Sequence, residues 1–433
     1  MVKLGSLFFV CTVLAVAIIV SPLIRPVCAV ATVTWSKTYG GAGNERAYAM
    51  VKTNDGGYAL AGTTNSFSQG LINAWLLKVG SDGTPQWDQV FSGLGVGIVT
   101  CMVQTGDGGY ALGGYTYSLD KGGVNPWIVK TDSTGNLLWN NTYSQLGFGI
   151  IYGLVQNLDL SLTVVGAYNS FGDSGVDSFL ARINADGGLR WNRTFAGPGE
   201  DELFAILKAG DGGYVLGGYT SSWDSTNGST NFWLLKTDAS GMLVWNHTYS
   251  GFGSAVLSTV AQTSDGGYAL VGYRRLSGQD DFLLVKTDSS GLMLWNKTYS
   301  QSNLDDALCG IQTVDGGYAI AGVTNASGTA MVKVWLIKTD PLGEIQWNQT
   351  YNETGQTVPT SLVQASDGGY VLAGYMNSTT ENGEDFWLMK TDEFGVVPEY
   401  PNALMFTTFL FAVTISCIAL HRKFKIKQGY AEK

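Results

Sequence analysis

Short segments in which apolar and polar residues alternate fill most of this chain, and tight turns rich in glycine separate them. Between residues 97 and 143 the pattern predicts four strands, at 97–105, 110–116, 126–131 and 137–143. The first two flank Gly106-Asp107-Gly108-Gly109, whose glycines can adopt positive φ and whose aspartate can bond the backbone of the turn. The pattern therefore predicts one antiparallel unit of four strands.

The same unit occurs seven times, with a period of about 52 residues. Six copies keep an Asp-Gly-Gly-Tyr turn, and the third copy has Asp159-Leu160-Ser161-Leu162 in its place. The repeated aspartates are Asp55, Asp107, Asp159, Asp211, Asp265, Asp315 and Asp367. A glycine follows each of them by seven residues, and most copies end in a strand that contains a tryptophan. Such regularity indicates one repeat domain rather than several unrelated ones.

Stacked around an axis, these units can bury both faces of every sheet, which predicts an all-β, seven-bladed β-propeller with four antiparallel strands per blade. The last repeat lacks its tryptophan, because Val396-Val397-Pro398 stands there, whereas an extra one, Trp35, precedes the first repeat. We therefore predict that residues 32–39 supply the fourth strand of the last blade. This N-terminal strand would close the ring and remove two open sheet edges.

The segment from Lys130 to Trp139, KTDSTGNLLW, resembles the tryptophan-docking repeat of quinoprotein-type propellers, in which an Asp, a Gly and a Trp lock adjacent blades. Gly80 and Asn184 depart from this motif at the Asp position. The Asp-Gly-Gly-Tyr hairpins and Trp-Asn-x-Thr-Tyr strands are similar to repeat proteins of archaeal and bacterial cell surfaces. The resemblance covers residues 32–395, and it implies a fold without specifying an activity.

The N-terminal residues 1–31 have the features of an export signal peptide. Lys3 precedes an apolar run, and Ala29-Val30-Ala31 forms a small-x-small cleavage site. An uncleaved signal anchor is the alternative, because the apolar run is long. A lipoprotein signal at Cys28 is disfavoured, because Val27 stands where a small residue is expected.

At the C-terminus, residues 403–420 carry no charge and precede a basic tail, residues 421–433. This predicts a single-pass transmembrane helix joined to the repeats by a linker, residues 397–402. The positive-inside rule places the tail in the cytoplasm and the repeats, residues 32–396, outside the cell membrane. The linker sequence Pro398-Glu399-Tyr400-Pro401 is also similar to archaeal sorting signals, after which the helix is removed.

Composition and charge limit which classes of binding partner, and which kinds of catalytic or metal site, are expected. The predicted ectodomain has 18 basic and 34 acidic residues, a net charge of about −16, which disfavours nucleic acid and anionic polymers. It contains one histidine, His247, and no phosphate-binding loop, EF-hand or cysteine metal pair. We therefore expect no catalytic constellation, metal or cofactor.

Cys101 and Cys309 each occupy a repeat position that holds small residues in the other copies, and their two blades are not neighbours in the ring. Their Cα atoms are therefore too far apart for a disulfide, so we predict two free, buried thiols.

The turns divide into two sets that lie on opposite faces of the predicted ring. The first and third turns of each blade form one face, here called the turn face, and their sequences vary little. Its aspartates Asp132, Asp238, Asp288, Asp340 and Asp392 are expected to cap backbone amides rather than to bind calcium. The second turns and the crossovers form the loop face, and they vary in length and content.

Because loops carry binding on rigid scaffolds, we place candidate ligand contacts on the loop face at Trp223, Arg274 and Arg275. Acidic pairs there, such as Asp280-Asp281 and Asp305-Asp306, are expected to be solvated loop charges. Glycosylation acceptors are Asn140, Asn192, Asn227, Asn246, Asn296, Asn325, Asn348, Asn352 and Asn377. Five of them lie on outer strands and point away from the tryptophan. The alternative is that Asn and Thr are simply suitable outer-face residues.

The expected function is that of a membrane-anchored extracellular glycoprotein that binds a surface glycan, polymer or protein, or acts as a scaffold for it. The rival hypothesis is an exported enzyme, either a quinoprotein-like oxidoreductase or a polysaccharide-cleaving propeller. Only the enzyme requires a cluster of unlike polar residues over the central channel that breaks the repeat pattern.

Overall fold

The computed structural model describes residues 35–67, 71–92, 95–118, 123–169, 175–223, 228–325, 332–351, 355–377 and 383–397, which belong to one compact unit of the chain. The predicted signal peptide, transmembrane helix and basic tail lie outside the described residues. Within those ranges no helix has the length and apolar character needed to cross a membrane.

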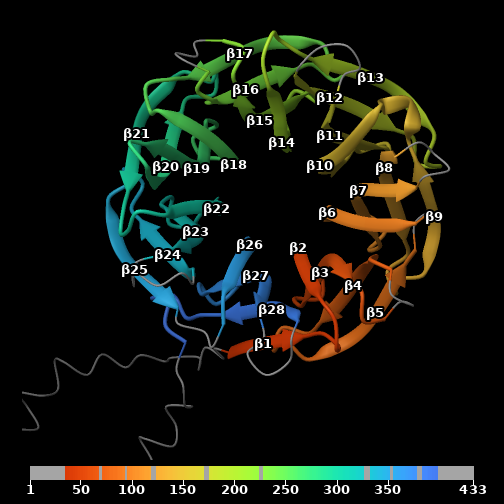
Figure 1. The fold of residues 1–433 in the computed structure, drawn as a ribbon. Helices are drawn as coiled ribbons and strands as arrows, with labels where there is room; N and C mark the ends of the chain where they lie inside the picture. The colour runs from red at the N-terminus through yellow and green to blue at the C-terminus, as the bar shows by residue number, and fades with distance from the viewer. Residues whose placement is uncertain are drawn as a thin grey trace, which may run out of the picture. The chain divides into compact units, whose positions relative to one another are not determined.

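The described residues form seven four-stranded antiparallel sheets arranged as the blades of a ring (Figure 1). Blade 1 holds β2 (Glu45–Lys52), β3 (Tyr58–Thr64), β4 (Asn73–Val79) and β5 (Pro85–Phe91). Blade 2 holds β6 (Val96–Gln104), β7 (Tyr110–Ser118), β8 (Gly123–Thr131) and β9 (Leu137–Thr142). After a short 3-10 helix, η2 (Ser144–Leu146), blade 3 holds β10 (Phe148–Gln156), β11 (Leu162–Asn169), β12 (Val176–Ile183) and β13 (Leu189–Phe195).

The remaining blades follow the same order. Blade 4 holds β14 (Asp201–Lys208), β15 (Tyr214–Thr220), β16 (Asn231–Thr237) and β17 (Leu243–Tyr249). Blade 5 holds β18 (Ser254–Gln262), β19 (Tyr268–Leu276), β20 (Gln279–Thr287) and β21 (Met293–Tyr299). Blade 6 holds β22 (Asp305–Gln312), β23 (Tyr318–Thr324), β24 (Lys333–Thr339) and β25 (Ile345–Tyr351). Blade 7 holds β26 (Thr357–Gln364), β27 (Tyr370–Asn377), β28 (Glu384–Lys390) and β1 (Trp35–Tyr39).

Ring closure occurs as the sequence predicts. The N-terminal strand β1 pairs antiparallel with β28, in a register that runs from Trp35 opposite Lys390 to Tyr39 opposite Phe386. The Trp387 indole also donates a hydrogen bond of 3.0 Å to the Ser36 hydroxyl. The prediction that an N-terminal strand completes the last blade is therefore confirmed.

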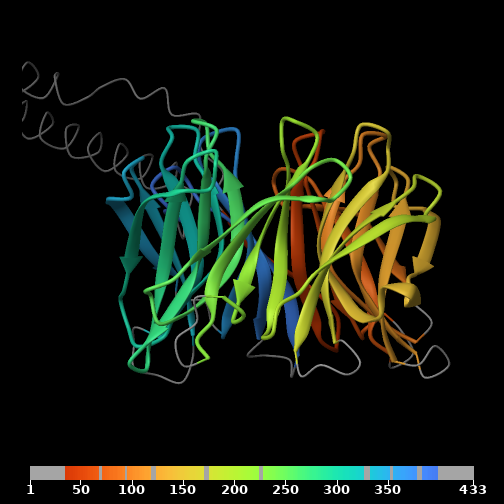
Figure 2. The ribbon, with the colours of Figure 1, turned by 90° about the horizontal axis from the view of Figure 1, so that it is seen from above.

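The first strand of each blade is innermost, and the chain then runs outward through the sheet (Figure 1). Because successive strands are antiparallel, the first and third turns of every blade lie on the turn face, and the second turns and crossovers lie on the loop face. Figure 2 shows the ring edge-on, with the strands running between these two faces. Each innermost strand thus begins at the loop face and ends at the turn face.

Tryptophans of the outer strands join each blade to the next. A Cβ atom placed on Gly83 would lie 2.7 Å from the Trp35 ring, and the positive φ of Gly83, +74°, independently favours glycine. The same indole-on-glycine packing occurs at Gly135, Gly187, Gly241, Gly291, Gly343 and Gly395. At five junctions a tyrosine hydroxyl donates to the carbonyl of the same glycine, as Tyr249 does to Gly291 at 2.6 Å. The ring is therefore closed by seven equivalent contacts.

The repeated turns also confirm the predicted backbone caps. The Asp132 carboxylate accepts hydrogen bonds from the Thr134 and Asn136 amides at 2.9 and 2.8 Å. Asp238, Asp288, Asp340 and Asp392 make the same pair of contacts in their own blades.

Neither of the two described cysteines forms a disulfide. Cys309 is buried, as predicted, whereas Cys101 retains some exposure. Burial raises the pKa of both thiols to about 12, so both stay protonated and weakly reactive near neutral pH.

Candidate functional site

The three predicted ligand contacts lie near the loop face, but two of them have structural partners. Trp223 is 40% exposed, and its ring centroid lies 5.3 Å from that of the buried Trp233. Arg274 and Arg275 stand opposite Asp281 and Asp280 in the β19–β20 ladder, at nitrogen-to-oxygen distances of 2.9 and 2.6 Å.

The prediction that Asp280 and Asp281 are solvated loop charges was therefore wrong, and Arg274 and Arg275 also lie in strands rather than in a loop. Strands β19 and β20 continue to a two-residue turn, Ser277-Gly278, in which φ is +54° and +81°. Positive φ at both central residues is typical of the hairpin turn that matches strand twist. The arginines and aspartates are thus cross-strand ion pairs rather than free loop charges.

The acidic pairs expected to be solvated are largely buried near the starts of strands β20 and β22. Asp305 has no exposed surface, and Asp280 and Asp281 are each 5% exposed. The Asp305 carboxylate accepts hydrogen bonds from the Gln301 and Ser302 amides at 2.6 and 2.7 Å. The crossover folds back over the strand end at this point, so its amides require an acceptor there.

A set of partly exposed aromatic residues, which the sequence pattern did not predict as a site, lies on the inner strands and their neighbours. We call it the aromatic arc, and it consists of Tyr48, Tyr115, Tyr152, Phe204, Tyr219 and Tyr375. Ring centroids are 6.4 Å apart for Tyr48 and Tyr375, and 5.0 Å apart for Tyr152 and Phe204. Phe204 and Tyr219 are 5.7 Å apart. The arc therefore follows the inner strands through blades 7, 1, 2, 3 and 4.

Polar groups sit beside both ends of the arc. The Arg46 guanidinium lies 5.1 Å from the Tyr375 ring centroid and pairs with Glu384. At the other end, the Tyr219 hydroxyl donates to Glu202 at 2.7 Å. Burial raises the pKa of Glu202, and it raises the pKa of Tyr152 to about 12. The Tyr152 and Tyr219 hydroxyls, whose pKa values are both raised by burial, are thus protonated donors at neutral pH.

Across the ring, blades 5 and 6 form an acidic corner made of Tyr273, Arg275, Asp280 and Asp306. One carboxylate oxygen of Asp306, Oδ1, is buried and has no hydrogen-bond partner within the described residues. Burial raises the pKa of Asp306 to about 6, and the Asp280 carboxylate adds to the shift while Arg275 opposes it. Asp306 therefore retains a proton in mildly acidic solution.

A comparison of equivalent positions could have revealed the arc. One residue of each inner strand lies in a β-bulge, and these residues are Tyr48, Thr100, Tyr152, Phe204, Ser258, Leu308 and Thr360. The hydroxyls of Thr100, Ser258 and Thr360 donate to a carbonyl of the next inner strand. Tyr48, Tyr152 and Phe204 do not make this hydrogen bond, so the bulge accepts side chains of different size and chemistry.

The described part of the chain holds no group of three His, Cys, Asp or Glu side chains suited to a metal ion. Of the glycosylation candidates, Asn140, Asn192, Asn246, Asn296 and Asn348 are exposed on the outer strands, and Asn377 is exposed at the end of β27. Asn325 is partly buried, and its amide oxygen has no partner in the described ranges. Asn227 and Asn352 lie outside those ranges. The proposed attachment of sugars stays a prediction.

No protein-family model and no curated protein sequence matches this chain. Among solved structures, an ulvan lyase of a polysaccharide lyase family has a TM-score of 0.54 at 9% identity, over 83% of this chain and 97% of the lyase. Sqt1 from Chaetomium thermophilum has a TM-score of 0.47 at 10% identity, over 83% and 99% of the two chains. The β-propeller domain of the Trilobed protease from Pyrococcus furiosus has a TM-score of 0.47 at 9% identity, over 84% and 96%. This chain is a seven-bladed β-propeller, and identities of this size show the fold alone.

Proposed function

We propose that this protein is an extracellular, membrane-anchored propeller that binds a glycan along the aromatic arc. The observation that carries the proposal is the run of partly exposed aromatic rings over five consecutive blades. Three of them, Tyr48, Tyr152 and Phe204, occupy the bulge position in which blades 2, 5 and 7 have Thr or Ser. Flat aromatic faces with hydroxyl donors suit sugar rings, which present C–H groups on one side and hydroxyls at the edge. Glu202 and Arg46 add acceptors and donors at the two ends.

The test uses the purified full-length chain and a panel of neutral and charged oligosaccharides. Phe204→Thr places in blade 4 the residue that blades 2 and 7 carry in the same slot, so the fold should be kept. We expect at least a tenfold loss of affinity for the bound glycan, since a packed aromatic anchor contributes about 2 kcal/mol. Leu308→Thr makes the matched change in blade 6, outside the arc, and should leave affinity unchanged. Equal affinity of the Phe204→Thr and wild-type proteins would contradict the proposal.

A second candidate function, cleavage of a polysaccharide, is favoured by the acidic corner. Asp306 combines an unpartnered buried oxygen with a pKa of about 6, which suits a general acid. In that case turnover should decline as pH rises above about 6, and Asp306→Asn should abolish turnover without weakening glycan binding. If a bound glycan yields no cleaved product at pH 5, the cleavage hypothesis is contradicted and only the binding function stands.

A further inference from the structure

We use the word corner for the Asp-Gly-Gly-Tyr turn of a blade, or its equivalent, together with the residues around it. The corner of blade 3 differs from the others. In the third repeat, Leu160 and Ser161 replace the paired glycines, Arg182 replaces the repeated lysine, and the next blade has Lys208 where five blades have glutamine. Leu160 keeps the left-handed backbone of the glycine it replaces, with φ of +63°. These changes come from two blades, yet they meet at the junction between blades 3 and 4.

Glutamine normally closes the space between neighbouring corners. The Gln104 side chain accepts from the Asn54 amide at 3.0 Å and donates to the Gly108 carbonyl at 3.2 Å. Lys208 cannot accept a hydrogen bond, so the equivalent Leu158 amide loses this contact. Neither the Leu158 amide nor the Lys208 ammonium has a partner in the part of the chain that the structure describes.

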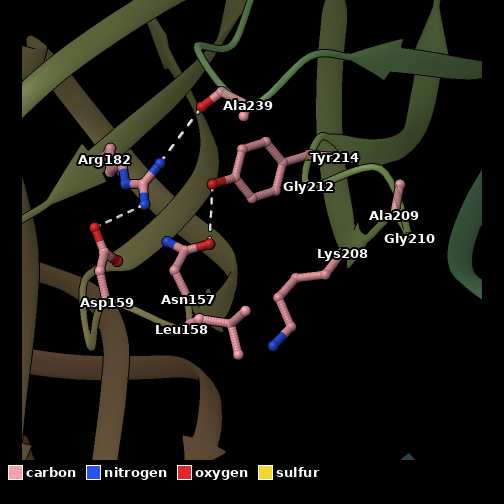
Figure 3. A pocket seen from close by; sticks show the side chains of 10 residues that line it. All are labelled: Asn157, Leu158, Asp159, Arg182, Lys208, Ala209, Gly210, Gly212, Tyr214 and Ala239. Atoms are coloured by element: carbon pink, nitrogen blue, oxygen red, sulfur yellow. Dashed lines mark hydrogen bonds and ion pairs between the residues drawn. The ribbon is translucent and has the colours of Figure 1, made fainter.

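The result is a pocket of about 440 Å³ (Figure 3). Its polar lining includes Asn157, Asp159, Arg182, Lys208 and Tyr214, and its remaining walls are Leu158, Ala209, Gly210, Gly212 and Ala239. Arg182 donates to Asp159 at 3.0 Å and to the Ala239 carbonyl at 3.4 Å, and Tyr214 donates to Asn157 at 2.9 Å. Except for Lys208, the charged lining is thus held in place.

The pocket has an excess of positive charge. Arg182 and Arg190 share the single carboxylate of Asp159, at 3.0 and 3.3 Å, and Lys208 adds a third cation. In the other six blades the equivalent aspartate pairs with one lysine, so its charge is balanced. A cationic pocket on a strongly acidic domain favours an anion.

We propose that this pocket binds the carboxylate of a uronic acid residue. Lys208 and Leu158 both line the pocket, and within the described residues neither the Lys208 ammonium nor the Leu158 amide donates a hydrogen bond, so both donors are open to the oxygens of a carboxylate. The volume exceeds what a simple ion requires, and Leu158, 99% exposed, offers an apolar surface to a sugar ring. This site is separate from the aromatic arc and does not depend on it.

The experiment titrates the full-length protein with galacturonate and, in parallel, with galactose. We expect saturable binding of galacturonate and at least a tenfold lower affinity for galactose. Lys208→Gln restores the residue of five other blades, so it should preserve the fold and reduce galacturonate affinity at least tenfold. Lys52→Gln makes the same change in blade 1, where Lys52 donates to Ser366 at 2.7 Å, and should not alter binding.

Three results would overturn the proposal. The first is that the wild-type protein does not bind galacturonate saturably, and the second is that it binds galactose with the same affinity as galacturonate. The third is that Lys208→Gln keeps the wild-type affinity for galacturonate while its circular dichroism and melting temperature are unchanged. Phe204→Thr should weaken glycan binding at the arc and leave galacturonate affinity unchanged. This result would show that the two sites bind independently.

Discussion

The corner of blade 5 and the corner of blade 3 contain the same backbone turn built from different side chains. In blade 5 the Gly266 amide donates to the Thr263 carbonyl at 2.9 Å, and in blade 3 the Leu160 amide donates to Asn157 at 3.1 Å. Gln312 closes the first corner by accepting from the Ser264 amide at 2.7 Å, whereas Lys208 leaves the second open. Backbone hydrogen bonds thus determine the turn, and side chains at the blade junction determine whether a pocket exists.

Removal of residues 32–39 should have the largest effect, because it opens the ring between blades 7 and 1. The deletion exposes the edge of β28 and removes the partly buried Trp35 and Tyr39, and truncation of one large aromatic side chain in a core costs about 3–5 kcal/mol. We expect the free energy of unfolding to fall by at least about 5 kcal/mol, as measured by urea denaturation. Removal of the tail 421–433 is the length control. A melting curve unchanged by the first deletion would show that the ring does not need its closing strand.

The second prediction tests the ion pairs of the regular corners. Lys286 is only 5% exposed at its side chain and lies 2.8 Å from Asp265, and Lys236 and Asp211 make the same pair in blade 4. Changing both aspartates to asparagine leaves two buried ammonium groups without a counter-charge, at about 1–3 kcal/mol each. Urea denaturation at pH 7 measures the loss. Galacturonate binding at the blade 3 corner should persist, and its disappearance in a folded variant would show that the corners are coupled.

The same pairs make stability depend on acid. The Lys286 ammonium, followed by the Thr263 hydroxyl, lowers the pKa of Asp265 to about 2. Between pH of about 4 and 2 the unfolded chain therefore binds more protons than the folded one, so stability is complete above pH 4 and declines as pH falls through this window. The double variant should show a shallower decline. An identical pH profile for the variant and the wild type would contradict this origin of acid sensitivity.

The smallest effect concerns Leu160, which adopts the left-handed backbone conformation that Gly266 adopts in blade 5. Leu160→Gly should stabilise the protein by up to about 1 kcal/mol, because a left-handed conformation costs a non-glycine residue about 1–2 kcal/mol and glycine loses some chain entropy. Gly266→Ala is the reverse change, at a site where an added Cβ meets nothing within 4 Å, and should destabilise by about 1 kcal/mol. Chemical denaturation compares both, and two shifts of the same sign would refute the argument.

The repeat and its displaced tryptophan were sufficient to predict the propeller, the closing strand and the backbone caps, since these depend on local spacing. The sequence did not show that Arg274 lies in a strand, because nothing local distinguishes a loop from a longer hairpin, and Arg274 meets Asp281 only once β19 and β20 pair. The aromatic arc escaped notice because Phe204 occupies a bulge whose orientation depends on the neighbouring blade. The third repeat alone does not indicate the pocket, because the pocket also requires Lys208 of the following blade.

The closing strand also imposes an order of events during synthesis. Trp35 and Lys390, which pair in the finished ring, are separated by about 350 residues, so at roughly 5–20 residues per second the ribosome needs roughly 20–70 s to produce the second after the first. For that time β1 has no partner, and the face of blade 1 that packs on blade 7 is uncovered. Pairing of β1 with β28 therefore follows synthesis of nearly the whole ring, and any delay in it prolongs the period in which β1 can pair with another chain.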